Sequence, residues 1–260
     1  MNILEKIIEQ KKIEVAERKQ IVSETLLMQT KHFDRKCFSL VDNLNNANTT
    51  GIIAEFKRKS PSKGFINEHA NVVEVTTGYT EAGAACLSVL TDREFFGGST
   101  ADLVAARVNA IPILRKDFII DQYQIIEAKA MGADVILLIA ACLTVEEVKK
   151  LSAFAVAVGL EVLLELHDET ELDHICEDTI LIGINNRNLK DFKVDINASL
   201  NMAKKIPDNK IKIAESGISN VDMIKKFKEA GFKGFLIGET FMKESNPAVA
   251  FNTFAKNINV

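Results

Sequence analysis

The stretch Gly51-Ile-Ile-Ala-Glu-Phe-Lys-Arg-Lys-Ser-Pro-Ser-Lys-Gly64 begins as an apolar run and ends as a polar, basic segment. In an extended strand the side chains alternate between two faces, so Glu55 and Lys57 share a face with Ile53, whereas Phe56 lies on the other. A carboxylate and an ammonium among core residues cost roughly 2–5 kcal/mol unless they are paired or used. The stretch therefore predicts a buried strand with charged groups at its distal end.

The segment after this strand, residues 58–64, is rich in groups that bind anions. Taken alone, it fits two interpretations about equally well: a buried ion pair followed by a solvated basic turn, or part of a ligand site. The choice between them depends on whether other strands in the chain end in the same way.

Apolar runs rich in β-branched residues alternate with helical segments from residue 51 to the end of the chain. The predicted strands are Ile52–Phe56, Cys86–Leu90, Ile111–Arg115, Val135–Ile139, Val162–Leu166, Ile180–Ile184, Ile211–Ala214 and Gly234–Ile237. The predicted helices are Val72–Ala82, Ala101–Ala110, Asp121–Met131, Val145–Val158, Asp168–Cys176, Asn197–Lys205, Val221–Ala230 and Pro247–Asn257. Hydrophobic strands joined by helices indicate a parallel sheet covered on its outer face, and eight such units predict a closed (β/α)8 TIM barrel.

Residues 1–50 precede the first strand and form an N-terminal helical extension of the barrel, which spans residues 51–260. Apolar residues recur at helical spacing over residues 2–29 and predict one helix, and a short helical piece is predicted over residues 38–44. The extension could pack on the barrel, shape the mouth of a site or meet another subunit. Because no linker or low-complexity tract interrupts the sequence, we expect a single domain over the whole chain.

The composition excludes several classes of protein. The 260 residues are 47% hydrophobic and 26% charged with a net charge of −4, so no global basic field exists to hold nucleic acid or an anionic membrane. No apolar run approaches the roughly 20 residues that span a bilayer, and the first twenty residues alternate charge too often for a signal peptide. Scattered cysteines and histidines without ligand spacing predict reduced thiols in a cytoplasmic protein and no metal site.

Ionisable or amide groups stand at the ends of six predicted strands, where barrel enzymes place their catalytic residues. In chain order these groups are Glu55, Lys57, Arg115, Lys116, Asp117, Glu165, His167, Asn185, Asn186, Arg187, Glu215, Ser216 and Glu239. The opposite strand ends show no such convergence. One rim is therefore predicted to carry a single pocket.

The segments after the seventh and eighth predicted strands, Glu215-Ser-Gly-Ile-Ser219 and Leu236-Ile-Gly-Glu-Thr240, each place a glycine where backbone can approach a ligand. Barrel phosphate sites are commonly built in these two loops from backbone N–H groups. With the hydroxyl of Ser60 across the barrel seam, they predict a phosphorylated small molecule as ligand. We expect Glu239 to contribute only its backbone N–H, with the carboxylate turned away from the phosphate it would repel.

The predicted rim mixes two lysines, Lys57 and Lys116, with two carboxylates, Glu55 and Glu165. Such a mixture supports general acid–base chemistry, because partial burial and opposite charges place proton donors beside acceptors. A lysine could instead form a Schiff base with a carbonyl substrate, as in barrel aldolases. A purely structural ring of ion pairs is the third interpretation, and sequence spacing does not separate the three.

Residues Ile53-Ala-Glu-Phe-Lys-Arg-Lys-Ser-Pro-Ser-Lys-Gly64 closely resemble the signature of the indole-3-glycerol-phosphate synthase family, barrel enzymes of tryptophan biosynthesis. The resemblance covers practically the whole chain, including the N-terminal helices. It continues through Ser88-Val-Leu-Thr-Asp-Arg-Glu-Phe-Phe-Gly-Gly-Ser99, Leu114-Arg-Lys-Asp-Phe-Ile-Ile-Asp121, Gly183-Ile-Asn-Asn-Arg-Asn-Leu189, Ala214-Glu-Ser-Gly-Ile218 and Leu236-Ile-Gly-Glu239.

The resemblance implies a lyase that closes the ring of 1-(2-carboxyphenylamino)-1-deoxyribulose 5-phosphate, with loss of CO2 and then water, to give indole-3-glycerol phosphate. It implies no cofactor, because the carboxylate sits on the attacked carbon and its loss restores the aromatic ring. The expected partner is this phosphorylated small molecule, with no nucleic acid and no membrane. We expect a monomer or a weak homo-oligomer.

The resemblance also implies roles for individual residues. Lys116 looks like the general acid that protonates the ketone, and Glu165 would orient it and accept or relay a proton. Lys57 would hold the substrate carboxylate or donate a proton in the dehydration, in which Glu55 also acts; the two lysine roles could be exchanged. The remaining site residues are the positioning residues Asn185 and Arg187, the ring-pocket residues Phe95 and Phe118, and the phosphate-site residues Ser60, Ser216, Gly217, Gly238 and Glu239.

Two other functions compete with this one. Another phosphosugar-binding barrel enzyme, such as a phosphoribosylanthranilate isomerase, would need a Cys–Asp acid–base pair at the first and sixth strands. Those strand ends carry Glu55 and Asn185 instead. A barrel kept as an interaction scaffold would have lost the charged rim, and the rim is intact.

Overall fold

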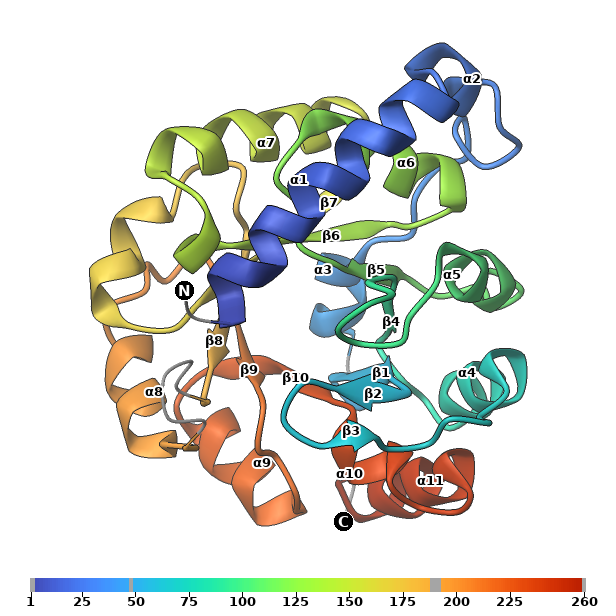
Figure 1. Cartoon of the computed structure of the whole chain (residues 1–260). Helices are drawn as coiled ribbons and strands as arrows, with labels where there is room; N and C mark the ends of the chain where they lie inside the picture. Colours follow the sequence, from blue (N-terminus) through green and yellow to red (C-terminus); the bar gives the residue numbers. More distant parts are fainter. Residues whose placement is uncertain (1–2, 47–48, 188–192, 259–260) are drawn as a thin grey trace.

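A computed structural model describes residues 3–46, 49–187 and 193–258 (Figure 1). Asn2 of the predicted first helix and the last two residues of the 183–189 motif lie outside the described residues. Eight parallel strands close into a barrel in the order β1-β10-β9-β8-β7-β6-β5-β4, and helices surround it. The predicted (β/α)8 TIM barrel is confirmed.

The barrel strands lie close to their predicted positions. They are β1 (Ile52–Phe56), β4 (Cys86–Leu90), β5 (Ile113–Lys116), β6 (Val135–Ile139), β7 (Glu161–Leu166), β8 (Leu181–Asn185), β9 (Ile211–Glu215) and β10 (Phe232–Ile237). The outer helices are α4 (Val72–Glu81), α5 (Thr100–Ala106), α6 (Gln122–Met131), α7 (Val145–Ala157), α8 (Ile196–Ala203), α9 (Val221–Glu229) and α11 (Pro247–Ile258). No helix within the described ranges is long and apolar enough to cross a membrane.

The first strand shows how the core is divided. Ile52, Ala54 and Phe56 belong to the large apolar cluster between the strands and the outer helices. Ile53 belongs to a second cluster, formed largely by inward-facing strand residues, and Glu55 continues on the Ile53 face and lines a cavity. The alternation predicted for this strand is confirmed, and it delivers Glu55 and Lys57 to the barrel mouth.

Two loops differ from the sequence prediction. The helix predicted over residues 168–176 is a short 3-10 helix, η2 (Glu169–His174), because its charged run contains only Leu172 as an apolar anchor and forms no apolar stripe. The segment after β1 forms a small antiparallel hairpin, β2 (Lys59–Ser60) with β3 (Gly64–Phe65). Two further short helices follow β6 and β10: η1 (Ala140–Cys142) and α10 (Glu239–Met242).

The N-terminal extension covers both ends of the barrel. The predicted single helix is divided into α1 (Ile3–Ile21) and α2 (Glu24–Met28), because the Ser23 side chain accepts the Leu26 N–H and caps a new helix. Helix α1 crosses the face where the strands end (Figure 1), and three of its residues line the cavity there. Helix α3 (Leu40–Asn45) closes the opposite end, where Leu40 and Leu44 join the inward-facing cluster.

Candidate active site

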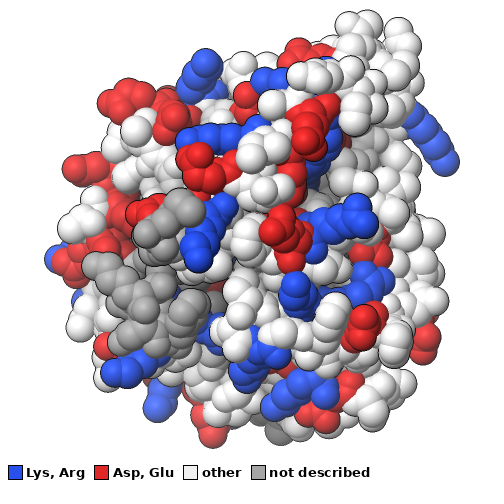
Figure 2. Space-filling view, viewed as in Figure 1, with Lys and Arg blue, Asp and Glu red and all other residues white. Residues whose placement is uncertain are grey.

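A cavity of about 390 Å³ lies at the carboxyl end of the barrel, within the size range of small-molecule sites. On this face Lys and Arg side chains are interspersed with Asp and Glu, and neither sign dominates (Figure 2). The cavity is lined by every predicted site residue except Phe95: Glu55, Lys57, Ser60, Lys116, Phe118, Glu165, Asn185, Arg187, Ser216, Gly217, Gly238 and Glu239. The convergence of the strand ends on one pocket is confirmed.

Lys116 stands at the end of β5 and is held by two carboxylates from other strands. Its Nζ lies 2.8 Å from Glu165 Oε2 on β7 and 2.9 Å from Glu215 Oε2 on β9. Burial alone would lower the pKa of Lys116, but the attraction of Glu165, Glu215 and Glu55 raises it above its ordinary range. The lysine therefore stays an ammonium at neutral pH.

Glu165 and Glu215 share that single ammonium, and their pKa values move apart. Burial by itself would raise the pKa of Glu165, but Lys116 and His167 hold it well below its usual value. Burial raises the pKa of Glu215 to about 8, because the repulsion of Glu165 adds to burial and offsets part of the attraction of Lys116. At neutral pH Glu165 is therefore a carboxylate, while Glu215 keeps its proton to a higher pH.

His167 and Asn185 complete the surroundings of Glu165. His167 Nε2 lies 3.0 Å from Glu165 Oε1, and Asn185 donates its Nδ2–H to the same oxygen at 3.0 Å. Burial would lower the pKa of His167, but its bonds to Glu165 and Glu171 raise it to about 10. His167 and Glu215 follow or end their strands, yet the sequence predicts no individual role for them. Their position at a strand end was the only available signal.

The end of β1 contributes a second acid–base pair. Lys57 Nζ lies 2.7 Å from Glu55 Oε1, and the Glu55 side chain is only 4% exposed. Gly238 at the end of β10 explains how the two strands approach so closely, because a Cβ there would lie 2.6 Å from Glu55 Oε1. A glycine expected to serve a phosphate therefore also makes room for Glu55.

The loops after β9 and β10 are joined by a hydrogen bond, and the backbone of the first loop is strained at Ser216. Ser216 has φ of +65°, the only positive value among the non-glycine residues that the structure describes, and Gly217 follows with +71°. Asn186 donates its Nδ2–H to the Ser216 carbonyl at 2.8 Å, and Thr240 donates its hydroxyl to the Ile218 carbonyl at 2.7 Å. Backbone strain held by such bonds is characteristic of binding sites.

Ser60 and Glu239 lie at the same side of the cavity. The Ser60 hydroxyl is buried and has no hydrogen-bond partner among the described residues, so it is available to a ligand. The Glu239 carboxylate, which we expect to turn away from a bound phosphate, is paired with cations. It lies 2.5 Å from Lys63 Nζ and 3.9 Å from Arg187 Nη2, so cations offset the charge that would repel a phosphate.

Phe95 does not line the cavity, and the sequence prediction for it is wrong. Asp92 Oδ1 accepts the N–H groups of both Phe95 and Phe96, at 2.8 and 3.2 Å, and forms a tight turn after β4. This turn places Phe96 at the cavity, where its ring centroid lies 6.0 Å from that of Phe118. Neighbouring phenylalanines are not distinguishable by composition, and the turn decides between them.

Helix α1 supplies an apolar cover to the cavity through Ile3, Leu4 and Ile7. Of the three roles that the sequence left open for the extension, packing on the barrel and shaping the mouth of the site are both observed. Within the described ranges, no cluster of three or more His, Cys, Asp or Glu side chains could hold a metal ion.

A (β/α)8 barrel with paired lysines and carboxylates beside two glycine-containing loops defines an enzyme of acid–base type. The indole-3-glycerol phosphate synthase family model matches residues 4–254. The chain is 46% identical over 258 residues to the indole-3-glycerol phosphate synthase of Bacteroides thetaiotaomicron, with 99% of each chain covered. It is 42% identical to that of a Polaromonas species over 254 residues, with 96% of each covered. The chain belongs to the indole-3-glycerol phosphate synthase family.

Solved structures with the same fold are more distant in sequence. A 3-hexulose-6-phosphate synthase superposes with a TM-score of 0.63 at 14% identity, covering 80% of this chain and 99% of that one. A chain of the tryptophan synthase complex of Pyrococcus furiosus gives 0.60 at 14% identity, covering 82% and 98%. At this identity the likeness shows the barrel fold alone.

Proposed function

We propose that this chain converts 1-(2-carboxyphenylamino)-1-deoxyribulose 5-phosphate to indole-3-glycerol phosphate with release of CO2 and water, which makes it a carboxy-lyase. The observation that carries the proposal is the position of Lys116, an ammonium held by Glu165 and Glu215 inside a cavity with an aromatic wall. An isomerase of the same pathway is not supported, because Glu55 and Asn185 occupy the positions of its Cys–Asp pair.

Ring closure requires a proton donor at the ketone. The aryl carbon that bears the carboxylate attacks the ketone carbon, and the carbonyl electron pair moves to oxygen and takes a proton from Lys116. The developing oxyanion is more basic than an amine, so even a lysine with a raised pKa transfers its proton favourably and stabilises the charge before transfer. A Schiff-base lysine would need a lowered pKa, and this one is raised.

Decarboxylation and dehydration then need one further donor and one acceptor. The bond to the carboxylate breaks, CO2 leaves and the electron pair restores the aromatic ring. Lys57 protonates the departing hydroxyl, and Glu55 accepts the proton that the ring carbon next to nitrogen loses. The 2.7 Å separation of Lys57 and Glu55 supports this division, since the pair forms one donor and one acceptor on the same strand.

The two ends of the substrate meet different walls. Phe96 and Phe118 pack against the carboxyphenyl ring, while Arg187 and Lys57 provide cations for its carboxylate. The phosphate binds the backbone N–H groups of the loops after β9 and β10, together with the Ser60 hydroxyl. Asn185 orients Glu165 from the side.

The test is to mix the purified chain with the proposed substrate, without added metal or cofactor, and to follow indole fluorescence and CO2 release separately. Product that forms at a rate proportional to enzyme supports the proposal, and no product from folded protein contradicts it. Lys57→Ala should release CO2 faster than it forms indole. Lys116→Ala should neither release CO2 nor form indole. The opposite pattern would exchange the roles of the two lysines.

A further inference from the structure

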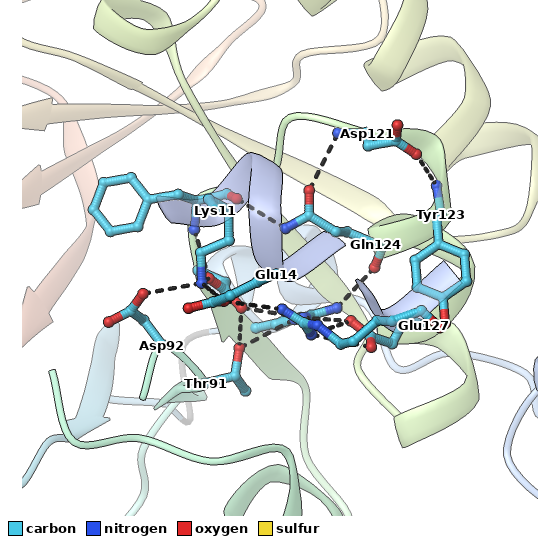
Figure 3. A network of polar contacts seen from close by, with 12 residues as sticks. Lys11, Glu14, Thr91, Asp92, Asp121, Tyr123, Gln124 and Glu127 are labelled. Carbon is cyan, nitrogen blue, oxygen red and sulfur yellow. Dashed lines mark hydrogen bonds and ion pairs between the residues drawn. The ribbon is translucent and has the colours of Figure 1, made fainter. Parts of the chain in front are cut away.

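Lys11 on helix α1 is a lysine buried almost completely, with 1% of its side chain exposed. Its ammonium lies 2.9 Å from Asp92 Oδ2, 3.0 Å from Asp117 Oδ1 and 2.8 Å from Glu14 Oε2 (Figure 3). An unpaired ammonium at such a place would cost several kcal/mol, so the three carboxylates account for its being there. Nothing in the proposed chemistry uses this group.

Two of these carboxylates, Asp92 and Asp117, belong to the barrel loops and bind the backbone of the phenylalanines at the cavity. Asp92 binds the N–H groups of Phe95 and Phe96 through Oδ1, and Lys11 meets its other oxygen. Asp117 accepts the N–H of Phe118 at 2.9 Å through Oδ1, the oxygen that Lys11 contacts. One buried ammonium thus bridges the loops after β4 and β5, which carry the two rings that line the cavity.

The two loops depend on Lys11 to different degrees. Asp117 is also bound by Arg115 at 3.0 Å and by the Thr91 hydroxyl at 2.6 Å, so it keeps partners without Lys11. Asp92 Oδ2 has no hydrogen-bond partner among the described residues, which leaves the nearby Lys11 charge to compensate it. Loss of the ammonium should therefore disturb the turn that carries Phe96 more than the loop that carries Phe118.

Lys11 also fixes the cover of the cavity. It lies one helical turn after Ile7, and residues four apart share a face of a helix. Ile7 and the preceding turn of helix α1 lie over the cavity. Lys11 is on the same face of the helix and anchors that face to the barrel.

We propose that Lys11 is a positioning residue that sets the Phe96 turn and helix α1 against the cavity, and thereby determines how tightly the aromatic end of the substrate binds. This inference rests on the proposed function for the identity of that aromatic end. A purely structural anchor is the competing explanation. It predicts a loss of stability without a selective loss of binding.

The chain offers a matched control for the structural explanation. Lys19 on the same helix also forms an ion pair with the barrel, 2.7 Å from Asp121. Both side chains are more than a third exposed, and neither lines the cavity. Exposed pairs contribute about 0–1 kcal/mol. Lys19→Met therefore removes an ion pair between α1 and the barrel and leaves the aromatic wall intact.

The experiment measures kcat, KM, and inhibition by anthranilate and by inorganic phosphate for wild type, Lys11→Met, Lys11→Arg and Lys19→Met. In Lys11→Met we expect KM and the inhibition constant of anthranilate to rise about tenfold, with kcat within about threefold and phosphate inhibition within about twofold. Lys11→Arg should recover part of the loss, and Lys19→Met should resemble wild type. An unchanged KM in folded Lys11→Met, or equal weakening of both inhibitors, overturns the proposal.

Should Lys11→Met fail to fold, Asp92→Asn is the second variant, because it leaves Lys11 with Asp117 and Glu14. It should weaken anthranilate selectively in the same way, and unchanged anthranilate inhibition overturns the proposal. The inhibition constant of anthranilate is compared with that of phosphate in each variant. This comparison tests the role of Lys11 separately from the proposed function. An inactive wild type would refute the reaction, whereas an active wild type with insensitive variants would refute only the role of Lys11.

Discussion

Two buried ionic networks meet at the end of β5, where Lys116 and Asp117 are consecutive residues that serve different sides of the molecule. The Lys116 cluster, which we propose to be catalytic, consists of Lys116, Glu165, Glu215, His167 and Asn185 and lines the cavity. The Lys11 network consists of Lys11, Glu14, Asp92, Asp117, Arg115 and Glu127 and connects helix α1 to the barrel (Figure 3).

At the centre of the Lys11 network, one carboxylate contacts two cations. Asp117 lies between Lys11 and Arg115, and although burial would raise the pKa of this carboxyl, the two cations lower it to about 2. Arg115 is also 2.7 Å from Glu127, so each of these buried groups has an opposite charge in contact. Asp117 therefore stays a carboxylate near neutral pH and has no proton to exchange there.

The centre of the Lys116 cluster is the reverse of this, with one lysine between two carboxylates. Two carboxylates, Glu165 and Glu215, contact one lysine, and Glu215 Oε1 is buried without a hydrogen-bond partner among the described residues. The pKa of Glu215 consequently rises to about 8, where a proton can be gained or lost at working pH. The carboxylate between two cations keeps its charge, whereas Glu215, which shares one lysine with Glu165, can gain or lose a proton near neutral pH.

Replacing the shared cation should have the largest effect. Lys116→Ala should lower kcat by at least about two orders of magnitude, a typical loss for a general acid, because the ketone oxygen loses its donor. The measurement is steady-state indole fluorescence, with circular dichroism to confirm folding. If only the Lys116 cluster takes part in the chemistry, Lys11→Met lowers kcat by less than about threefold. Nearly unchanged turnover in Lys116→Ala would refute its role.

His167→Gln should reduce stability in a pH-dependent way. The folded-state pKa of His167 is raised to about 10, so its stabilising contribution is fully present below the unfolded value near 6.5 and is lost as pH rises through 10. We expect wild type to exceed the variant by about 2 kcal/mol in unfolding free energy at pH 6 and by little at pH 10. Urea denaturation at several pH values measures the difference, and a difference independent of pH would count against the charged pair.

Gly217→Ala should mainly affect binding. Its φ of +71° disfavours a side chain, and a Cβ would lie 2.6 Å from a methyl group of Val194, so the loop after β9 must shift. We expect KM to rise about tenfold with kcat within about threefold. Gly231→Ala is the matched control, because its φ is +83° and its nearest contact would be 3.9 Å away. Equal changes in both variants would mean that strain alone is responsible.

Glu215→Gln should stabilise the fold at alkaline pH while it slows the reaction. A carboxyl whose folded pKa is raised to about 8 contributes stability that is present below its unfolded value and is lost as pH rises through 8. Glutamine does not titrate, so the variant should gain about 1 kcal/mol over wild type at pH 9 and lose about tenfold in kcat. Lower stability of the variant at pH 9 would show that the charged form of Glu215 stabilises the fold, and it would contradict the raised pKa.

The barrel follows from sequence because its strands are short apolar runs and its helices separate them regularly. Boundaries fail where another principle intervenes. Ser23 begins a new helix by capping, and the charged run around Leu172 lacks the apolar stripe of an α-helix. The cap at Ser23 is a local effect that a hydrophobic pattern does not contain, whereas the missing stripe around Leu172 is visible in that pattern.

The site is predictable as a rim of strand ends but not as a set of partners. Glu215 and His167 stand at strand ends, yet only coordinates show that they share Lys116 and Glu165. Lys11 sits among Lys, Glu and Gln residues in a helix that suggests a solvated face, and its burial depends on partners about 80 and 105 residues away. Long-range charge pairing is therefore the part that the sequence alone leaves undetermined.

The most direct test of the raised pKa of Glu215 is the pH dependence of kcat/KM for wild type and Glu215→Gln, measured on the same substrate from pH 6 to 10. The account predicts that wild-type activity changes with an apparent pKa near 8 and that this transition is absent in the variant. The same transition in both proteins would contradict it.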